Sequence, residues 1–164
     1  MTLEKRVIVC DYNKCNRCGI CETECAMAME ESLDSSLSRI QVAITESIHH
    51  MAIACQLCDD PPCVKSCPRG ALLQSESGSI LVNEDKCTGC MWCINACDFG
   101  AIMPNPTKKI AFCDVSCIKT SGEEPPCVKA CPYEALTFST MDELSSKQRK
   151  DVINKLFSPR LMVS

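Results

Sequence analysis

Sixteen of the seventeen cysteines fall into four groups of four, and this spacing constrains the fold more than any other feature of the sequence. Two groups read C-x2-C-x2-C-x3-C, and in such runs three thiolates hold one [4Fe-4S] cubane while the fourth ligates a different cluster. The other two groups read C-x2-C-x4-C-x3-C-P and C-x3-C-x9-C-x3-C-P, which are the same run with a loop inserted. The groups are, in chain order, Cys15, Cys18, Cys21 and Cys25; Cys55, Cys58, Cys63 and Cys67; Cys87, Cys90, Cys93 and Cys97; and Cys113, Cys117, Cys127 and Cys131. The sequence therefore predicts an electron-transfer protein with four [4Fe-4S] clusters.

Disulfides, zinc and radical chemistry account for the cysteines less well. With one Trp, two Tyr and four Phe in 164 residues, the apolar core is thin and needs a staple of disulfides or metal. Disulfides call for an oxidising compartment and normally a secretory signal, and the N-terminus has no apolar stretch long enough to be one. Zinc sites use two pairs of cysteines, and not three thiols plus a fourth followed by Pro, as in Cys67-Pro68. The C-x3-C-x2-C run of radical S-adenosylmethionine proteins is not completed after Cys25 or Cys117.

Composition excludes several other functions. The formal charge is −4 at pH 7, and cluster-bound thiolates would make the protein more anionic, so nucleic acid is not an expected partner. No stretch approaches the roughly eighteen apolar residues of a membrane span, and we expect a soluble, cytoplasmic protein. The two histidines, His49 and His50, are adjacent and predicted to be solvated loop residues. Without a phosphate loop or an acid-base constellation, the chain is predicted to be no enzyme.

A short phrase repeats after three of the four runs. It reads Cys67-Pro-Arg-Gly-Ala-Leu72, Cys97-Asp-Phe-Gly-Ala-Ile102 and Cys131-Pro-Tyr-Glu-Ala-Leu136. Each copy predicts a helical turn that leads into a strand packed over a cluster. Apolar strand candidates are Arg6 to Cys10, Arg39 to Thr45, Ile80 to Val82, Lys109 to Phe112 and Leu136 to Ser139. The repeat predicts an α+β fold with short helices and small antiparallel sheets, in two halves that each resemble a bacterial ferredoxin.

The order of the runs suggests how the chain divides. We expect one four-cluster domain over residues 1–139, followed by an amphipathic helix and tail over 140–164. One half would take residues 5–31 and 105–139, and the other half would take 46–104. Residues 26–54 form an insertion between the first two runs, whose first residues continue the helix of Cys25.

Two features lie outside the ligand runs. Thr140-Met-Asp-Glu143 fits a capping box before a helix with one apolar side that ends near Ser158-Pro159. We expect this helix to fold back on its own domain, with docking on a partner subunit or on another copy of the chain as the alternative. Cys10, the seventeenth cysteine, lies in an apolar strand candidate and is predicted to be structural.

Residues 5 to 139 resemble the four-cluster ferredoxin-type electron-transfer subunits. That family accompanies dimethyl sulfoxide reductase, formate dehydrogenase, hydrogenase, carbon monoxide dehydrogenase and tungsten aldehyde oxidoreductase. The likeness is carried by the four runs in this order and by the segments Cys55-Gln-Leu-Cys-Asp-Asp-Pro-Pro-Cys-Val-Lys-Ser-Cys-Pro68 and Pro125-Pro-Cys-Val-Lys-Ala-Cys-Pro132. In this chain the fourth run opens C-x3-C where the family usually has C-x2-C, and Asp98 stands where Pro commonly follows the fourth Cys. An ionised Asp98 is predicted to lower the potential of the nearby cluster.

The resemblance implies a crossed ligation, in which the first run pairs with the fourth and the second with the third. The implied ligand sets are site A, with Cys15, Cys18, Cys21 and Cys131; site B, with Cys25, Cys113, Cys117 and Cys127; site C, with Cys55, Cys58, Cys63 and Cys97; and site D, with Cys67, Cys87, Cys90 and Cys93.

The resemblance also implies a role. The chain would be the non-catalytic subunit of an oxidoreductase complex in anaerobic metabolism, between a catalytic subunit and a second electron carrier. Its small size favours the soluble types found beside carbon monoxide dehydrogenase, aldehyde oxidoreductase or formate dehydrogenase. Two alternatives stay open: a free-standing diffusible polyferredoxin, and a conduit that assembles into filaments through the C-terminal tail.

Overall fold

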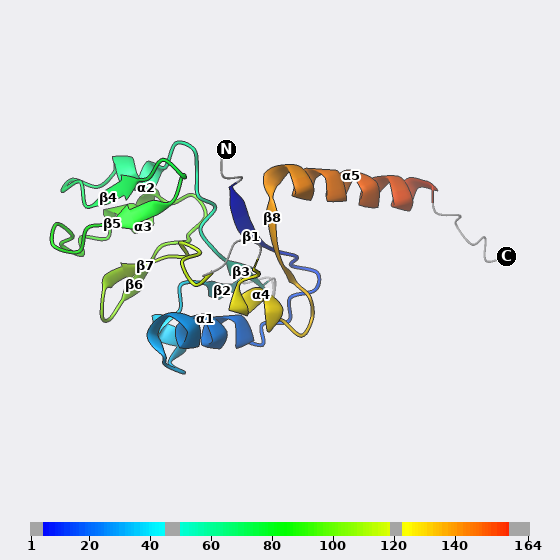
Figure 1. The fold of residues 1–164 in the computed structure, drawn as a ribbon, viewed down its shortest axis with the longest axis horizontal. Coiled ribbons are helices and arrows are strands. Elements are labelled where there is room, and N and C mark those ends of the chain that lie inside the picture. The colour runs from blue at the N-terminus through cyan, green and yellow to red at the C-terminus, as the bar shows by residue number, and fades with distance from the viewer. Residues whose placement is uncertain (1–4, 45–49, 119–122, 158–164) are drawn as a thin grey trace.

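The computed structural model describes residues 5–44, 50–118 and 123–157, which form short helices and two-stranded sheets (Figure 1). The elements are, in chain order, β1 (Arg6–Cys10), α1 (Ile20–Glu30), the 3-10 helix η1 (Ser35–Leu37), β2 (Gln41–Ile44), β3 (His50–Ile53), α2 (Pro62–Lys65), β4 (Leu72–Gln74), β5 (Ile80–Val82), α3 (Trp92–Ala96), β6 (Met103–Asn105), β7 (Lys109–Ala111), α4 (Pro126–Lys129), β8 (Leu136–Thr140) and α5 (Met141–Phe157). The predicted α+β class is confirmed. Thr45, His49 and the predicted helix end near Ser158 lie outside the described residues.

All strand pairs are antiparallel: β1 with β8, β2 with β3, β4 with β5 and β6 with β7. In the first pair Arg6 lies opposite Thr140 and Cys10 lies opposite Leu136, so the two ends of the ligand-bearing region meet in one ribbon. Each of the five strand candidates overlaps a strand of the structure, although β8 extends one residue beyond its candidate, to Thr140. The strands predicted after the repeated phrase are β4, β6 and β8.

The prediction of a solvated loop at His50 is wrong. His50 begins β3, is half-buried and pairs with Ile44 of β2. Ala52 of the same strand is buried against the core, and this tertiary contact, with the pairing to β2, makes a strand of four residues stable. The insertion therefore contains the end of α1, the 3-10 helix η1 and the antiparallel strand pair of β2 and β3.

Helices α1 to α4 each carry a cysteine of a ligand run, and the residues at their N-terminal ends determine where each helix begins. In α2 and α4 a Pro occupies the first helical position, where its missing N–H is not needed and its fixed φ suits the helix. Before α1 and α3 stand residues with left-handed backbone, Gly19 with φ 75° and Met91 with φ 64°. Each of these two turns lies between the second and third cysteine of a run, so the chain reverses sharply there.

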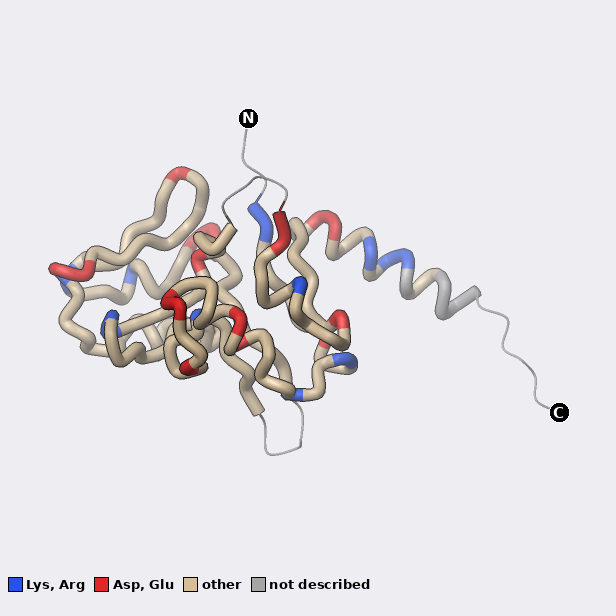
Figure 2. The backbone as a smooth tube through the Cα atoms, turned by 60° about the horizontal axis from the view of Figure 1, so that its bottom comes forward, with Lys and Arg blue, Asp and Glu red and all other residues tan. Residues whose placement is uncertain are grey.

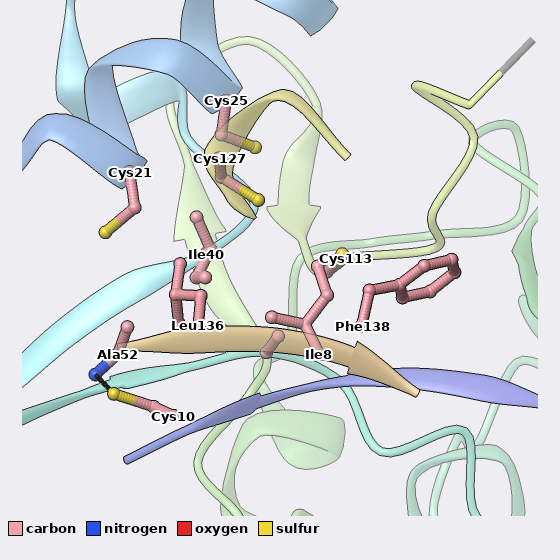
Figure 3. Packing of buried hydrophobic residues seen from close by; sticks show 11 residues of the cluster. Ile8, Cys10, Cys21, Cys25, Ile40, Ala52, Cys113, Cys127, Leu136 and Phe138 are labelled. Atoms are coloured by element: carbon pink, nitrogen blue, oxygen red, sulfur yellow. Dashed lines mark hydrogen bonds between the residues drawn. The ribbon is translucent and has the colours of Figure 1, made fainter. Parts of the chain in front are cut away.

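The buried apolar side chains form two hydrophobic clusters. The first contains Ile8, Ile40, Leu136 and Phe138 together with cysteines of the first and fourth runs (Figure 3). The members of the second are Cys63, Leu72, Ile80, Cys93, Ile102, Ile110 and Phe112. Ile110 and Phe112 pack in the second hydrophobic cluster. The predicted division assigns both residues to the other half, that of residues 5–31 and 105–139.

The C-terminal helix begins with the predicted capping box. The Thr140 N–H donates to the Glu143 carboxylate at 3.0 Å, and the Glu143 N–H donates to the Thr140 hydroxyl at 3.2 Å. The prediction that α5 folds back is wrong, because α5 leaves β8 and extends away from the other elements (Figure 1). Its apolar residues Met141, Val152 and Ile153 are 66%, 49% and 53% exposed. In the part of the chain that the structure describes, no helix has the length and apolarity to cross a bilayer.

Candidate iron–sulfur sites

Three cavities are each lined by four ligand-run cysteines that come from two different runs. The first is lined by Cys55, Cys58, Cys63 and Cys97, the second by Cys67, Cys87, Cys90 and Cys93, and the third by Cys15, Cys18, Cys21 and Cys131. These sets are the sites C, D and A that the resemblance implies. Apolar side chains complete the walls, among them Phe112 in site C and Ile110 in site D.

Three of the four thiols of site B are buried, and the fourth, Cys117, is half-buried. Cys25, Cys113 and Cys127 are 8%, 8% and 4% exposed. Cys25, Cys113 and Cys127 belong to one buried cluster of side chains. Burial raises the pKa of Cys127, and the neighbouring thiolates of Cys113, Cys25 and Cys117 raise it further. In Figure 3 the sulfurs of Cys25 and Cys127 point to one side, whereas the Cys21 sulfur points to the opposite side. Helix α1 therefore sends one thiol to site A and another to site B.

The repeated phrase positions the fourth cysteine of three runs. In each copy the N–H of the alanine four residues later donates to the cysteine sulfur: Ala71 to Cys67 at 3.2 Å, Ala101 to Cys97 at 3.4 Å and Ala135 to Cys131 at 3.3 Å. These alanines are at most 2% exposed, so a larger side chain has no room. Hydrogen bonds to the sulfurs help set cluster potentials. The phrase thus orients a thiolate and supplies it with a donor.

The donor set fits an iron–sulfur cluster. All seventeen cysteines are free thiols, and thiolate is the ligand that such clusters prefer. Among the described residues no group of three or more cysteines, histidines or carboxylates has the geometry to hold a single metal ion. Burial raises the pKa of Cys63 to about 11 and that of Cys21 and Cys113 to about 12. Binding of the cluster must therefore displace protons from these thiols.

Two residues outside the ligand sets lie against site A. Cys10 lines the cavity, is 7% exposed and accepts a hydrogen bond from the Ala52 N–H at 3.3 Å, an arrangement that agrees with a structural role. His50 places Nε2 2.7 Å from the carbonyl oxygen of Cys15. No local pattern in the sequence marks His50, because the contact joins the insertion to the first run. Asp98, which is exposed, lines the cavity of site C.

Comparison with known proteins places these sites in a family. Residues 47–141 match the family model described as a 4Fe-4S dicluster domain. The protein belongs to the 4Fe-4S dicluster family. This dicluster-family protein is 34% identical over 152 residues to the B subunit of anaerobic dimethyl sulfoxide reductase of Escherichia coli, an alignment that covers 84% of the chain and 74% of the relative. Its cofactors are accordingly [4Fe-4S] clusters, and the sixteen grouped cysteines suffice for four.

Two further relatives of this dicluster-family protein carry similar names. The B subunit of polysulfide reductase of Wolinella succinogenes is 34% identical over 165 residues, which cover 93% of the chain and 85% of the relative. Thiosulfate reductase electron transfer subunit PhsB of Salmonella typhi is 32% identical over 149 residues, with coverages of 84% and 77%. A solved benzoyl coenzyme A reductase complex, BamBC, aligns over 93% of the chain and 92% of its own with a TM-score of 0.45 and 18% identity.

Proposed function

We propose that the chain is the electron-transfer subunit of an oxidoreductase complex and passes single electrons through four [4Fe-4S] clusters. The observation that carries this proposal is that three cavities are each lined by four ligand-run thiols from two cysteine runs. The names of the relatives, which are subunits of reductases and in one case an electron transfer subunit, support it. When bound, the clusters supply one-electron sites with potentials in a range of about −700 to +450 mV.

The elements support one order of the sites along the molecule, A, B, C, D. Helix α1 carries Cys21 of site A and Cys25 of site B, so it joins these two. Phe112 lines site C and is followed in the chain by Cys113 of site B, which joins the halves. Site C leads to site D through α2 and the following turn. The two exposed ligands, Cys18 and Cys90, belong to sites A and D. Electrons would therefore enter and leave at these ends.

The protein's own residues hold the thiols and exclude water between the sites. Leu72, Ile80 and Ile102 are buried in the second hydrophobic cluster. The backbone N–H donors of the repeated phrase hold three thiolates in fixed directions. Because these contacts hold the thiols in place, we expect the protein around each cluster to rearrange little when the cluster gains an electron. The division into two halves and the four ligand sets are part of this proposal.

The partners follow from the ends of the path. One end would dock on a catalytic oxidoreductase subunit and the other on a second electron carrier. A reductase of the classes named for the relatives is one candidate catalytic partner, and the carbon monoxide dehydrogenase, aldehyde oxidoreductase and formate dehydrogenase types stay predictions. In this proposal the protein works in the cytoplasm, because a reducing compartment keeps cysteine thiols free for iron.

Helix α5 supports a second candidate, self-association into a conduit. It extends from the body with exposed apolar residues, begins with Asp142 and Glu143, and continues with basic residues (Figure 2). Removal of residues 141–164 would reduce the assembly size measured by light scattering if copies join through α5. An unchanged assembly size would assign α5 to the partner subunit or to no interface.

Anaerobic native purification with mass spectrometry of the bound chains tests the main proposal. We expect about sixteen irons per chain and a co-purifying oxidoreductase subunit. The purified chain should accept electrons from a low-potential reductant and pass them to an added ferredoxin. A chain that elutes alone with its irons would be the diffusible polyferredoxin, and a colourless chain would refute both functions.

A further inference from the structure

The fourth cysteine of the first run lacks the donor that the other three runs provide. The residue four positions after Cys25 is Met29, which lies inside α1, because this helix continues to Glu30. Its N–H is therefore part of the helix. The sulfur of Cys25 instead accepts a hydrogen bond from the N–H of Arg39 at 3.3 Å. Arg39 thus occupies, from the insertion, the place that a buried alanine takes beside the other three thiols.

The side chain of Arg39 reaches the fourth run. Its Nη1 donates to Asp114 Oδ1 at 2.8 Å and to the Ser116 hydroxyl at 3.2 Å. The side chain is only 16% exposed, so water weakens this charged contact less than it would on an open surface. One residue therefore contacts both of the cysteine runs that bring thiols to site B.

Asp114 organises the loop in which this chain departs from the family pattern. That loop runs from Cys113 to Cys117 and contains one residue more than C-x2-C. Asp114 Oδ1 accepts hydrogen bonds from the N–H and the hydroxyl of Ser116, and Val115 takes a left-handed backbone with φ 57°. The carboxylate closes the loop on itself, and Arg39 ties that carboxylate to the insertion.

The charges around Arg39 balance. Glu30 Oε1 lies 3.7 Å from Arg39 Nη2 and is also paired with Lys108. Two positive and two negative side chains therefore meet beside site B. Because the set is neutral, removal of one member leaves a net charge beside the site.

We propose that Arg39 is a positioning residue for site B, which donates its backbone N–H to Cys25, holds the Cys113–Cys117 loop through Asp114 and raises the potential of the cluster bound there. This inference rests on the proposed function. The guanidinium of Arg39 contacts Asp114, the residue next to Cys113, and the Arg39 N–H contacts the Cys25 sulfur, so a positive charge lies beside two of the four thiols. A positive charge that favours thiolate also favours the extra electron of the reduced cluster.

The test is a redox titration of the full-length, anaerobically purified protein, followed by electron paramagnetic resonance. The step that belongs to site B is the one that disappears in Cys117→Ala. In Arg39→Gln, which keeps the backbone donor and removes the charge, this step should move to lower potential by at least tenfold in its reduction equilibrium, about 59 mV for one electron. In Asp114→Asn, which keeps an acceptor and removes the negative charge, the same step should move to higher potential.

Two controls separate charge from mere structure. Arg39→Lys keeps the charge and should recover at least half of the Arg39→Gln shift, whereas Lys65→Gln, in an exposed ion pair on α2, should move no step at site B. If Arg39→Gln loses only the site B cluster, the loss supports the role of Arg39 in positioning the thiols of site B. The effect of the charge on the potential of that cluster is then measured in Arg39→Lys.

Three results would decide against the inference or its basis. Four unchanged midpoints in Arg39→Gln with all clusters present would overturn the inference. Shifts of the same sign in Arg39→Gln and Asp114→Asn would also overturn it, because a general distortion moves both in one direction. A parental protein without clusters would overturn the proposed function instead.

Discussion

Crossed ligation predicts that cysteines far apart in sequence act as one unit and that near neighbours do not. Cys55 and Cys97 line the same cavity although they belong to the second and third runs. Cys93 and Cys97 are separated by three residues, yet Cys93 lines the cavity of site D. Alanine substitutions at these three positions, alone and in pairs, therefore test which thiols share a cluster.

The expected magnitudes follow from the count of thiols in each cavity. Sixteen thiols in four sets of four correspond to about sixteen irons, so loss of one cluster removes about four of them. Cys97→Ala and Cys55→Ala should each lose about four irons, or about one if the site keeps a three-iron form. The double variant of Cys55 and Cys97 should lose no more than either single variant, because both remove corners of one cluster. The double variant of Cys93 and Cys97 should lose about twice as much.

Iron and acid-labile sulfide, measured per chain after anaerobic purification, give the result directly. Cys10→Ala serves as the matched control, because Cys10 lines a cavity without belonging to a ligand set and should keep all irons. If the losses of Cys93→Ala and Cys97→Ala overlapped while those of Cys55→Ala and Cys97→Ala added, each run would hold its own cluster. The crossed arrangement would then be refuted.

Three further predictions concern stability. Leu72→Ala truncates a side chain that is 2% exposed and should reduce the free energy of unfolding, measured by urea titration, by about 2–5 kcal/mol. The neighbouring Leu73 is 52% exposed, so Leu73→Ala should change that free energy by less than about 0.5 kcal/mol. The hydrogen bond from Lys108 lowers the pKa of Glu30 below its ordinary value of 4.5. The ionised Glu30 therefore stabilises the fold above that pH, and this stabilisation is lost as the pH falls through the folded pKa. The difference in unfolding free energy between the parent and Glu30→Gln should be largest at neutral pH and shrink in acid. Thr140→Ala should lower the helical circular dichroism of α5 and cost about 1 kcal/mol, and an unchanged spectrum would show that the capping box is dispensable.

Several local features could be read from the sequence because neighbouring residues determine them. The Pro-Pro pairs before α2 and α4 set the helix starts, and Thr140 with Glu143 forms the cap of α5. The repeated phrase specifies its own turn, since Gly70 and Gly100 supply the positive φ at the same place in two copies. The spacing of the cysteines likewise identifies the kind of cofactor without knowledge of the fold.

Other features depend on contacts between distant segments. His50 joins a strand and contacts Cys15, Phe112 packs in the second cluster, and α5 leaves the body instead of returning to it. None of these follows from local spacing, because each depends on which surface is left for the segment to contact. A four-residue strand such as β3 exists only because β2 and the core lie beside it.

The sequence by itself determined the candidate thiol ligands, their grouping into runs and the turn that follows three of them, since these depend on residues a few positions apart. Only the tertiary structure decided which runs share a cavity and which residue donates to Cys25. The physical reason is that a cluster site needs four sulfurs around one hollow, and folding brings Arg39 and the fourth run to Cys25 from parts of the chain that spacing does not connect.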